Sequence, residues 1–488
     1  MRPPDASAGD GRPNPILTVL AVLAVVLMAG VVLVPHAAGY FFLFDDFALV
    51  SIAMKSPVRE LFSKAIGGFF RPVALCGVRL ETFAFGWRLP AGYAVVSAAL
   101  HGLNSLLAFV LLRRLGQRRE PALLGAAVFL LSPWAGETYF WVSSQFDLYS
   151  VLFSFLALWL ALRGVDAPRL SGLLAGVVLV AAFGACLSKE MAVTLPGLFV
   201  VLCVWRQGLI GLRRRVLVFA AAMAAASAAS LLLRSRVIDT LGGAYGSLPS
   251  LWKRSDLLAT AWSQLRTFAL PPGGPVPAFD AAWGIPLALL IVAAFVSSPR
   301  ESFSAATGLA ISLAPVAWSV LEPGSTASGR YLYLPGFFVA ALVSLGFSGL
   351  YRRGWSPLLW KRVAPYPAVL LLAAGIGILI GQQRLWRQAF RLSRSSVDQV
   401  GREKGTARFL HVRNLPYTLL EGPYILKSYA FRLYFGTEEL KVRSDAVVFV
   451  TDGENVKPVR RFDDPFSEYA APIDATAEKE IVLDLRAR

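Results

Sequence analysis

"ILTVLAVLAVVLMAGVVLV", residues 16–34, is a continuous apolar run near the N-terminus. A helix needs about 20 such residues to cross a hydrocarbon core of about 30 Å. The run is long for the apolar region of a signal peptide and has no clear small-residue cleavage site behind it. We therefore expect an uncleaved first membrane span.

The composition of the whole chain agrees with a membrane protein. Of its 488 residues, 56% are hydrophobic and only 16% are charged, whereas a soluble protein of this length needs more polar surface. The net charge of +17 does not indicate a nucleic-acid partner, because the cationic clusters flank apolar blocks and can meet lipid headgroups. The three cysteines and three histidines are too scattered to predict a disulfide framework or a metal site.

The apolar blocks predict about eleven transmembrane helices, and the charges between them predict their direction. The expected spans lie near residues 15–36, 92–112, 121–136, 147–163, 170–187, 190–205, 215–233, 284–298, 303–320, 331–350 and 365–382. The turns after the second, fourth, sixth, eighth and tenth spans contain "RRLGQRRE", "RGVDAPR", "RQGLIGLRRR", "SSPRES" and "YRRGWSPLLWKR". Because cytoplasmic loops carry an excess of Arg and Lys, these turns and the N-terminus are expected in the cytoplasm and the other loops outside.

Two long connections fall on the expected outer face. In residues 37–91, "FALVSIAMKS" and "PVRELFSKAIG" are amphipathic and too short to span, so we expect two helices lying along the membrane plane. Residues 234–283 are rich in Gly and Pro and are consistent with either a lid or a linker.

The tail, residues 383–488, has a different composition. Its charge rises, and "GPYILKSYAFRLYFG" and "DAVVFVTDG" contain the aromatic and β-branched residues typical of strands. We expect a small extracytoplasmic domain of α+β or mainly β structure.

Polar side chains at a membrane face are costly and are therefore candidates for function. The informative ones gather on the expected outer side: Asp45, Asp46, Arg71, His101, Glu137, Asp147, Lys189, Glu190, Glu322 and Arg330. The expected cytoplasmic side has mainly Arg and Lys, which the charge rule already explains. We expect the chemistry on the outer side.

Asp45 and Asp46 lie in "YFFLFDDFAL", residues 40–49. Consecutive residues point in different directions, so the two carboxylates are expected to have separate roles. Asp46 is consistent with an N-cap of the following helix. Asp45 follows five apolar or aromatic residues, and partly dry surroundings favour a carboxyl group that works as a general base.

Each of the cationic candidates has two possible roles. Arg71 in "FFRPV" is either an arginine that reaches the lipid headgroups or a clamp on a phosphate. Lys189 and Glu190 in "CLSKEMAVTLP" either anchor a turn in water or bring a compact positive charge to a lipid phosphate.

The remaining candidates lie next to the spans. Arg330 and Tyr331 in "GRYLYLP" are either a phosphate site or a flanking anchor with an aromatic belt. His101 and Asn104 share one helix face, where an inter-helix hydrogen bond is the simpler role. Glu137 and Asp147 bracket one turn and are also consistent with loop caps.

Several of these strings, in this order, resemble one family. "FDDF", "FFRPVALCGVRLETFAFGWRLPAGY", "HGLNSLL", "LSKEMAVTLP" and "GRYLYLP" are similar to the GT-C-fold glycosyltransferases that use polyprenyl-phosphate sugars, and in particular to protein O-mannosyltransferases and transmembrane TPR-containing O-mannosyltransferases. The resemblance covers about residues 40–340. The chain departs from it at Ala94, Ser97 and Gln145, and its tail has no TPR repeats.

The resemblance implies an architecture and a reaction. Residues 1–382 would form a GT-C-like transmembrane catalytic domain in a bacterial inner (cytoplasmic) membrane, and residues 383–488 would form an extracytoplasmic domain. A sugar would move from a polyprenyl-phosphate donor to a hydroxyl of a protein or glycan acceptor, with inversion. Asp45 would be the catalytic base with Asp46 beside it, and Arg330 would lie near the lipid phosphate. A divalent metal ion on Asp45 or Asp46 is consistent with the residues but is not required by them.

Two other functions remain open at this point. A transporter or flippase for lipid-linked glycans would also need many spans and a charged groove, although no inverted repeat is visible. A glycan polymerase or ligase with a pyrophosphate-linked donor would share the reaction type.

Overall fold

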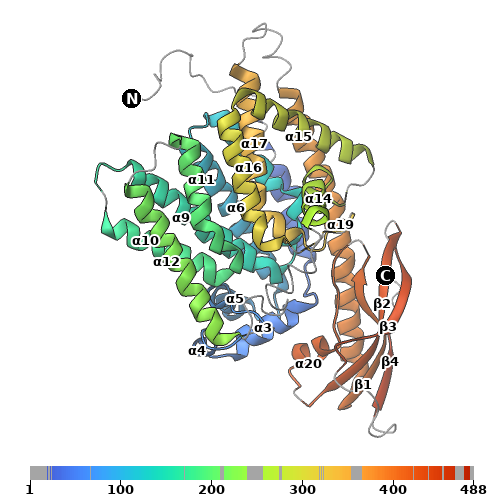
Figure 1. Cartoon of the computed structure of the whole chain (residues 1–488). Coiled ribbons are helices and arrows are strands. Elements are labelled where there is room, and N and C mark those ends of the chain that lie inside the picture. Colours follow the sequence, from blue (N-terminus) through green and yellow to red (C-terminus); the bar gives the residue numbers. More distant parts are fainter. Residues whose placement is uncertain are drawn as a thin grey trace.

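Long apolar helices make up most of the chain, and a small sheet follows them (Figure 1). The structure is a computed structural model that describes residues 19, 22, 23, 25–65, 68–169, 171–208, 214–238, 257–273, 277–317, 319, 321, 324–352, 365–420, 422–437, 439–452, 455–467 and 478–483. Glu322 lies outside this range, and so do residues 239–256 of the connection 234–283 that was predicted as a lid or a linker.

Each predicted span coincides with a helix or with part of one. The first is η1 (Met28–Leu33) continued by α2 (Val34–Gly39), and the others are α6 (Pro90–Arg114), α7 (Arg119–Leu131), α9 (Gln145–Asp166), α10 (Gly172–Ser188), α11 (Leu195–Gln207), α12 (Arg214–Val237), α15 (Pro277–Ser297), α16 (Pro299–Leu313), α17 (Tyr333–Arg352) and α19 (Pro365–Glu403). Among the described residues, seven helices are long and apolar enough to cross a membrane. The chain is therefore a multi-pass membrane protein, in which α7 and α16 are shorter, with 13 and 15 residues.

Helix α17 lies at the centre of the bundle. The apolar window of Gly329–Leu350 is completely buried, whereas only 28% of the window in Ala278–Ser297 is. Gly346 allows this close packing, because a Cβ at this position would lie 1.8 Å from the backbone oxygen of Leu290 in α15. The outer helices instead expose large apolar side chains, such as Leu173 in α10 and Leu232 in α12, as a lipid-facing surface requires.

Where the structure describes them, the ends of α6, α9 and α11 and the start of α16 meet at one end of the bundle, as the alternation of charge along the sequence predicts. At the end of α9, Asp166 binds Arg114 from the end of α6 (2.6 Å) and Arg206 from the end of α11. Arg300, at the start of α16, donates to the carbonyl of Trp205 (3.3 Å). We call this the cationic end. Asp147, near the start of α9, lies at the opposite end of the same helix.

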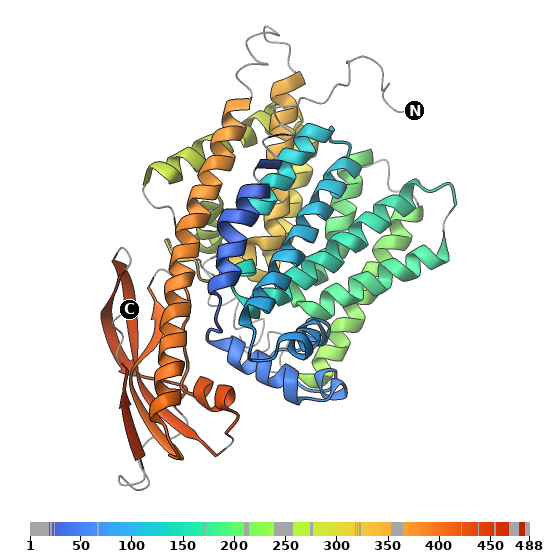
Figure 2. The same cartoon turned by 180° about the vertical axis from the view of Figure 1, so that it is seen from behind.

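Three helices cover that opposite end, where two were expected (Figure 2). They are α3 (Asp45–Lys55), α4 (Val58–Leu61) and α5 (Pro72–Phe85). The expected helix in "PVRELFSKAIG" is wrong in extent, since α4 is a single turn. Helix α5 was missed because its apolar residues were read as connection; Pro72 starts it, and Gly86 ends it with a positive φ of 52°.

The connection expected at residues 234–283 is largely helical in its described parts. Helix α12 continues to Val237, α14 spans Leu257–Ala269, and α15 begins at Pro277. The lid and the linker stay predictions for residues 239–256, which lie outside the described residues.

The last helix joins the bundle to the C-terminal sheet. Helix α19 runs past the expected boundary at residue 382 to Glu403, and the sheet packs beside its second half (Figure 2). The strands β1 (Phe409–Leu419), β2 (Lys441–Asp452), β3 (Asn455–Asp463) and β4 (Glu478–Val482) have the order β3-β2-β1-β4. Strand β1 is parallel to β2 and β4, and β2 is antiparallel to β3.

One strand prediction in the tail is wrong. "DAVVFVTDG" is in β2, but "GPYILKSYAFRLYFG" contains helix α20 (Tyr429–Phe435). This helix is the crossover that a pair of parallel strands requires. Its buried residues Ala430 and Phe431 pack into the interior of the domain, so tertiary burial overrides the strand preference of its aromatic residues.

Candidate functional site

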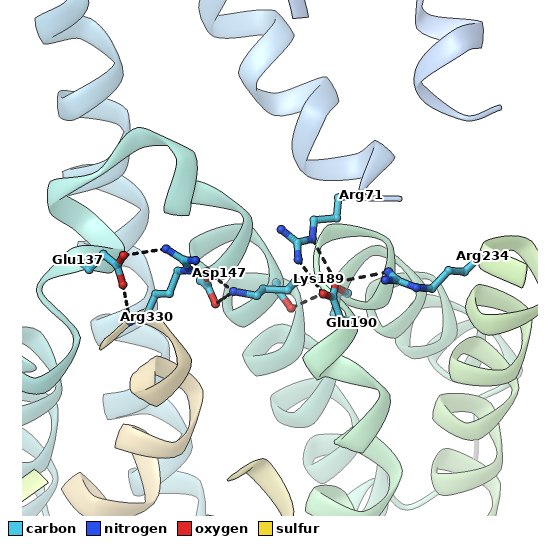
Figure 3. A network of polar contacts seen from close by, with 9 residues as sticks. Arg71, Glu137, Asp147, Lys189, Glu190, Arg234 and Arg330 are labelled. Atoms are coloured by element: carbon cyan, nitrogen blue, oxygen red, sulfur yellow. Dashed lines mark hydrogen bonds and ion pairs between the residues drawn. The ribbon is translucent and has the colours of Figure 1, made fainter. Parts of the chain in front are cut away.

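A row of ion pairs lies at the end of the bundle opposite the cationic end, beside α3 and α5 (Figure 3). We call it the polar row, and it consists of Arg71, Glu137, Asp147, Lys189, Glu190, Arg234 and Arg330. The short helices α8 (Glu137–Phe140), η4 (Glu190–Thr194) and η8 (Gly329–Leu332) supply three of these side chains, and Lys189 lies between α10 and η4. The four cationic and three anionic side chains leave one net positive charge.

At one end of the polar row, Glu137 holds Arg330. Its Oε1 accepts from Nη1 of Arg330 at 2.7 Å, and its Oε2 accepts from the backbone N–H of Arg330 at 3.2 Å. Burial raises the pKa of Glu137, and the charge of Arg330 opposes this shift. The guanidinium lies over the rings of Trp141 (5.1 Å) and Tyr331 (5.2 Å) and keeps 21% of its side chain exposed. Arg330 is therefore fixed in direction while its outer side remains accessible.

In the middle of the row, Lys189 and Asp147 form a buried pair. Nζ of Lys189 lies 2.5 Å from both carboxylate oxygens, and the two side chains are 3% and 4% exposed. Burial lowers the pKa of Lys189 to about 8, with Asp147 opposing the shift and Arg71 and Arg330 adding to it. The charges on both sides therefore affect the pKa of Lys189, which lies between the two halves of the polar row.

At the other end, Glu190 joins two arginines. Arg71 donates to both of its oxygens, at 3.1 Å and 2.7 Å, and Arg234 lies 3.5 Å away. The guanidinium of Arg71 also lies over the rings of Phe69 (4.3 Å) and Phe146 (5.2 Å). A shallow pocket opens beside Glu190 and Arg234, with mainly apolar lining from α10 and α12.

Asp46 is held by hydrogen bonds from three residues. It is fully buried, and it accepts hydrogen bonds from the hydroxyl of Tyr40 (2.6 Å), the backbone N–H of Leu43 (3.0 Å) and both the N–H (2.8 Å) and hydroxyl (2.5 Å) of Ser143. Burial raises its pKa to about 6, against the effect of these donors. The N-cap expected at Asp46 is wrong, since Phe44 holds that position. Asp46 instead fixes α3 to the turn that carries Trp141, beside Arg330.

Asp45 points elsewhere, as the direction of consecutive helical residues requires. Its side chain is 48% exposed, so Asp45 is half-buried beside the buried aromatic residue Phe44. Its Oδ1 binds Nζ of Lys427 from the C-terminal domain at 2.6 Å. Among the described residues, no three His, Cys, Asp or Glu side chains gather in a way that fits a metal ion.

His101 lies apart from the polar row, in the core between helices. Its Nδ1 is 2.7 Å from the hydroxyl of Tyr333, and its Nε2 is 2.6 Å from the carbonyl of Leu130. Asn104 donates to the carbonyl of Leu148 at 3.0 Å. The two residues form the inter-helix hydrogen bonds that their spacing favours.

A second buried polar group lies behind the site. Glu81, in α5, accepts from Gln145 at 3.0 Å and from the hydroxyl of Tyr149 at 3.2 Å, and burial raises its pKa to about 7. Gln145 also donates to the hydroxyl of Ser97 at 3.0 Å. Ser97 and Gln145, two of the positions at which the chain departs from the family pattern, are therefore hydrogen-bonded to each other.

The sequence located most of the polar row but not all of its members. Arg71, Glu137, Asp147, Lys189, Glu190, Arg330 and Tyr331 were predicted and lie together. Arg234 was missed because it ends an apolar span, where an arginine is expected for other reasons. Lys427 was missed because it lies 382 positions from Asp45, and no local pattern marks it.

No protein-family model matches the chain. No curated protein matches its sequence. Among solved structures, the chain is similar to ArnT from Cupriavidus metallidurans in the apo state, with a TM-score of 0.52 and 13% identity over 88% of this chain and 85% of that chain. The same protein bound to undecaprenyl phosphate gives a TM-score of 0.48 at 13% identity, over 88% and 86% of the two chains. The Archaeoglobus fulgidus oligosaccharyltransferase gives 0.42 at 13% identity, over 88% and 68%.

The likeness to ArnT concerns the fold. It extends over most of both chains. The GT-C fold implied by the sequence resemblance is confirmed, together with a polytopic helical membrane domain and a small C-terminal sheet domain.

Proposed function

We propose that this protein is a membrane glycosyltransferase that moves a sugar from a polyprenyl-phosphate donor to an acceptor hydroxyl on the extracytoplasmic face. The observation that carries the proposal is the polar row, whose accessible arginine lies at the same end of a GT-C-fold bundle as a half-exposed aspartate. The fold of ArnT supports the reaction class.

The donor phosphate is assigned to the arginines of the row. Arg330 and Arg71 are 21% and 11% exposed, whereas Lys189 is only 3% exposed and fully engaged by Asp147. Arginine binds phosphate oxygens in a fixed bidentate geometry. Arg330 and Arg71 therefore contact the phosphate. Lys189 does not contact it but adds to the positive charge of the polar row.

Asp45 is assigned as the base. The acceptor oxygen forms a bond to the anomeric carbon while the bond from that carbon to the phosphate oxygen breaks. The hydroxyl proton moves to the carboxylate of Asp45, and the polyprenyl phosphate leaves with the bonding electrons. Displacement in one step inverts the anomeric centre. Proton transfer of this kind contributes about 10²–10⁴-fold, and fixed cations that stabilise the leaving phosphate add to it.

The sidedness follows from the opposite end of the bundle. Arg114, Arg206 and Arg300 gather at the cationic end, and connections rich in arginine remain in the cytoplasm. The polar row and Asp45 then face the outside of the inner membrane.

The test is transfer by the purified protein in lipid nanodiscs. A panel of radiolabelled polyprenyl-phosphate hexoses and pentoses is incubated with an extract of envelope acceptors, and new glycosidic bonds are counted. The wild type and Asp166→Asn, which changes a carboxylate at the cationic end, are expected to transfer, whereas Asp45→Asn is expected to lose at least about 100-fold.

The other outcomes separate the remaining functions. Movement of the lipid-linked sugar across the bilayer without a new bond identifies a flippase. Transfer only from pyrophosphate-linked donors identifies a polymerase or ligase. Equal transfer by Asp45→Asn and wild type removes Asp45 as the base.

A further inference from the structure

The C-terminal domain reaches into the site through one side chain. We propose that Lys427 is a positioning residue for Asp45, so that the C-terminal domain completes the catalytic centre. This inference rests on the proposed role of Asp45 as the base. It assigns a task to a domain for which the sequence indicated none.

The contact itself joins the two parts of the molecule. Nζ of Lys427 lies 2.6 Å from Oδ1 of Asp45, and the lysine side chain is 9% exposed while the aspartate is 48% exposed. An ion pair between two mobile surface groups contributes little. Here the lysine is buried, and only the aspartate faces the surroundings.

Three aromatic rings hold the ammonium group. Nζ lies 3.8 Å from the ring centre of Phe44, 4.2 Å from that of Phe466 and 5.4 Å from that of Tyr429. Such cation–π contacts stabilise a partly desolvated cation. The cage contains one ring from the bundle and two from the C-terminal domain, so it forms only when the two parts are docked.

The backbone next to Lys427 is fixed by a buried carboxylate. Asp464 is 3% exposed and accepts from the backbone N–H of Ser428 (2.9 Å), the backbone N–H of Phe466 (2.9 Å) and the hydroxyl of Ser444 (3.0 Å). One carboxylate therefore ties together the residue after Lys427 and the residue that carries a cage ring. Side chains supported in this way keep their direction.

The bundle side of the contact is strained. Phe44, directly before Asp45, has φ of 39°, which is unfavourable for a residue with a side chain. Its backbone N–H donates to the carbonyl of Ile425 at 2.8 Å, and its ring stacks on Tyr424 at 4.8 Å. The C-terminal domain thus maintains the unusual backbone that sets the direction of Asp45.

The geometry favours positioning over masking of the carboxylate. The cage and Asp464 hold the lysine in place, so it is not arranged to swing away. It engages Oδ1, and about half of the Asp45 side chain stays open to an acceptor.

The experiment compares Lys427→Met and Lys427→Arg with wild type in the nanodisc transfer assay, at varied donor concentration. We expect Lys427→Met to lower kcat by about 10–100-fold with the donor KM within twofold, because the base loses its direction while the phosphate site is unchanged. Lys427→Arg keeps the charge and is expected to recover most of kcat. Lys404→Met, which removes a lysine lying over the Phe435 ring (5.2 Å) in the same domain, is the matched control and should transfer at the wild-type rate.

Each outcome decides one point. Wild-type kcat in Lys427→Met overturns the inference and leaves the proposed function intact, and raised kcat shows that the lysine masks the base instead. If Lys427→Met unfolds at a lower temperature than wild type, the folded pair Lys427→Arg and Lys427→Gln decides, and equal kcat in both overturns the inference. An inactive wild type overturns the proposed function and the inference together.

Discussion

The buried pair at the centre of the polar row gives a sharp stability prediction. Lys189→Met leaves Asp147 without its partner at a position where the side chain is only 4% exposed and the lost contact was 2.5 Å. Removing one member of a buried ion pair costs about 3–5 kcal/mol, because the other charge stays desolvated. The nearby carboxylate of Glu137 adds repulsion. We expect the free energy of unfolding of Lys189→Met to fall by about this amount.

The double variant Lys189→Met/Asp147→Leu separates the contribution of the ion pair from that of side-chain packing. Replacing both members of a buried pair by apolar residues is often nearly neutral, so we expect the double variant to recover most of the loss. The assay is denaturant unfolding in detergent micelles, followed by the fluorescence of the 12 tryptophans. Lys64→Met is the matched control, since Lys64 pairs with Glu60 at 3.2 Å but is 64% exposed. A loss below about 1 kcal/mol for Lys189→Met, or a double variant as unstable as the sum of the two single variants, would show that Lys189 and Asp147 do not form a buried ion pair.

Three further predictions concern the same detergent-solubilised protein. Burial raises the pKa of Glu81 to about 7 from 4.5, so between these pH values the folded state binds a proton that the unfolded state releases. As the pH rises from 4.5 to 7, the unfolding free energy of wild type should therefore fall by about 3 kcal/mol relative to that of Glu81→Gln. A difference between the two proteins that does not change with pH contradicts this. Asp46→Asn places an amide among four donors and should lower the unfolding free energy by about 2–5 kcal/mol, with an unchanged value showing that those bonds are not formed. Gly346→Ala should cost about 1–3 kcal/mol because its Cβ meets the Leu290 backbone, whereas Gly102→Ala, with open space around it, should be neutral or stabilising; equal thermal unfolding of the two contradicts the packing of α17.

The transmembrane part of the fold could be predicted from sequence because burial in lipid imposes long apolar blocks and charged turns. Residues 331–350, for example, coincide closely with α17. Prediction fails for short segments whose residues are compatible with more than one secondary structure. Helix α5 was missed because a short amphipathic helix on a membrane surface has no length requirement, and α20 was taken for a strand because its aromatic residues are strand formers until a parallel crossover needs a helix.

Site residues could be predicted where a charged side chain at a membrane face costs free energy. They could not be predicted where a contact joins residues far apart in the sequence. Lys189 and Glu190 stand out because charge in a tight turn between spans needs a reason. By contrast, the sequence "FDDF" cannot say which aspartate is buried, and the structure gives the four hydrogen bonds to Asp46 and the exposed position to Asp45. The pairing of Asp45 with Lys427 depends on how two domains dock, and local pattern carries no information on that.

The most direct measurement is a cryo-EM structure of the protein in nanodiscs with polyprenyl monophosphate added. We predict the phosphate within hydrogen-bond distance of the Arg330 guanidinium, on the same side of the bilayer as Asp45. A phosphate bound at the cationic end, beside Arg114 and Arg206, would show that the polar row is not the donor site.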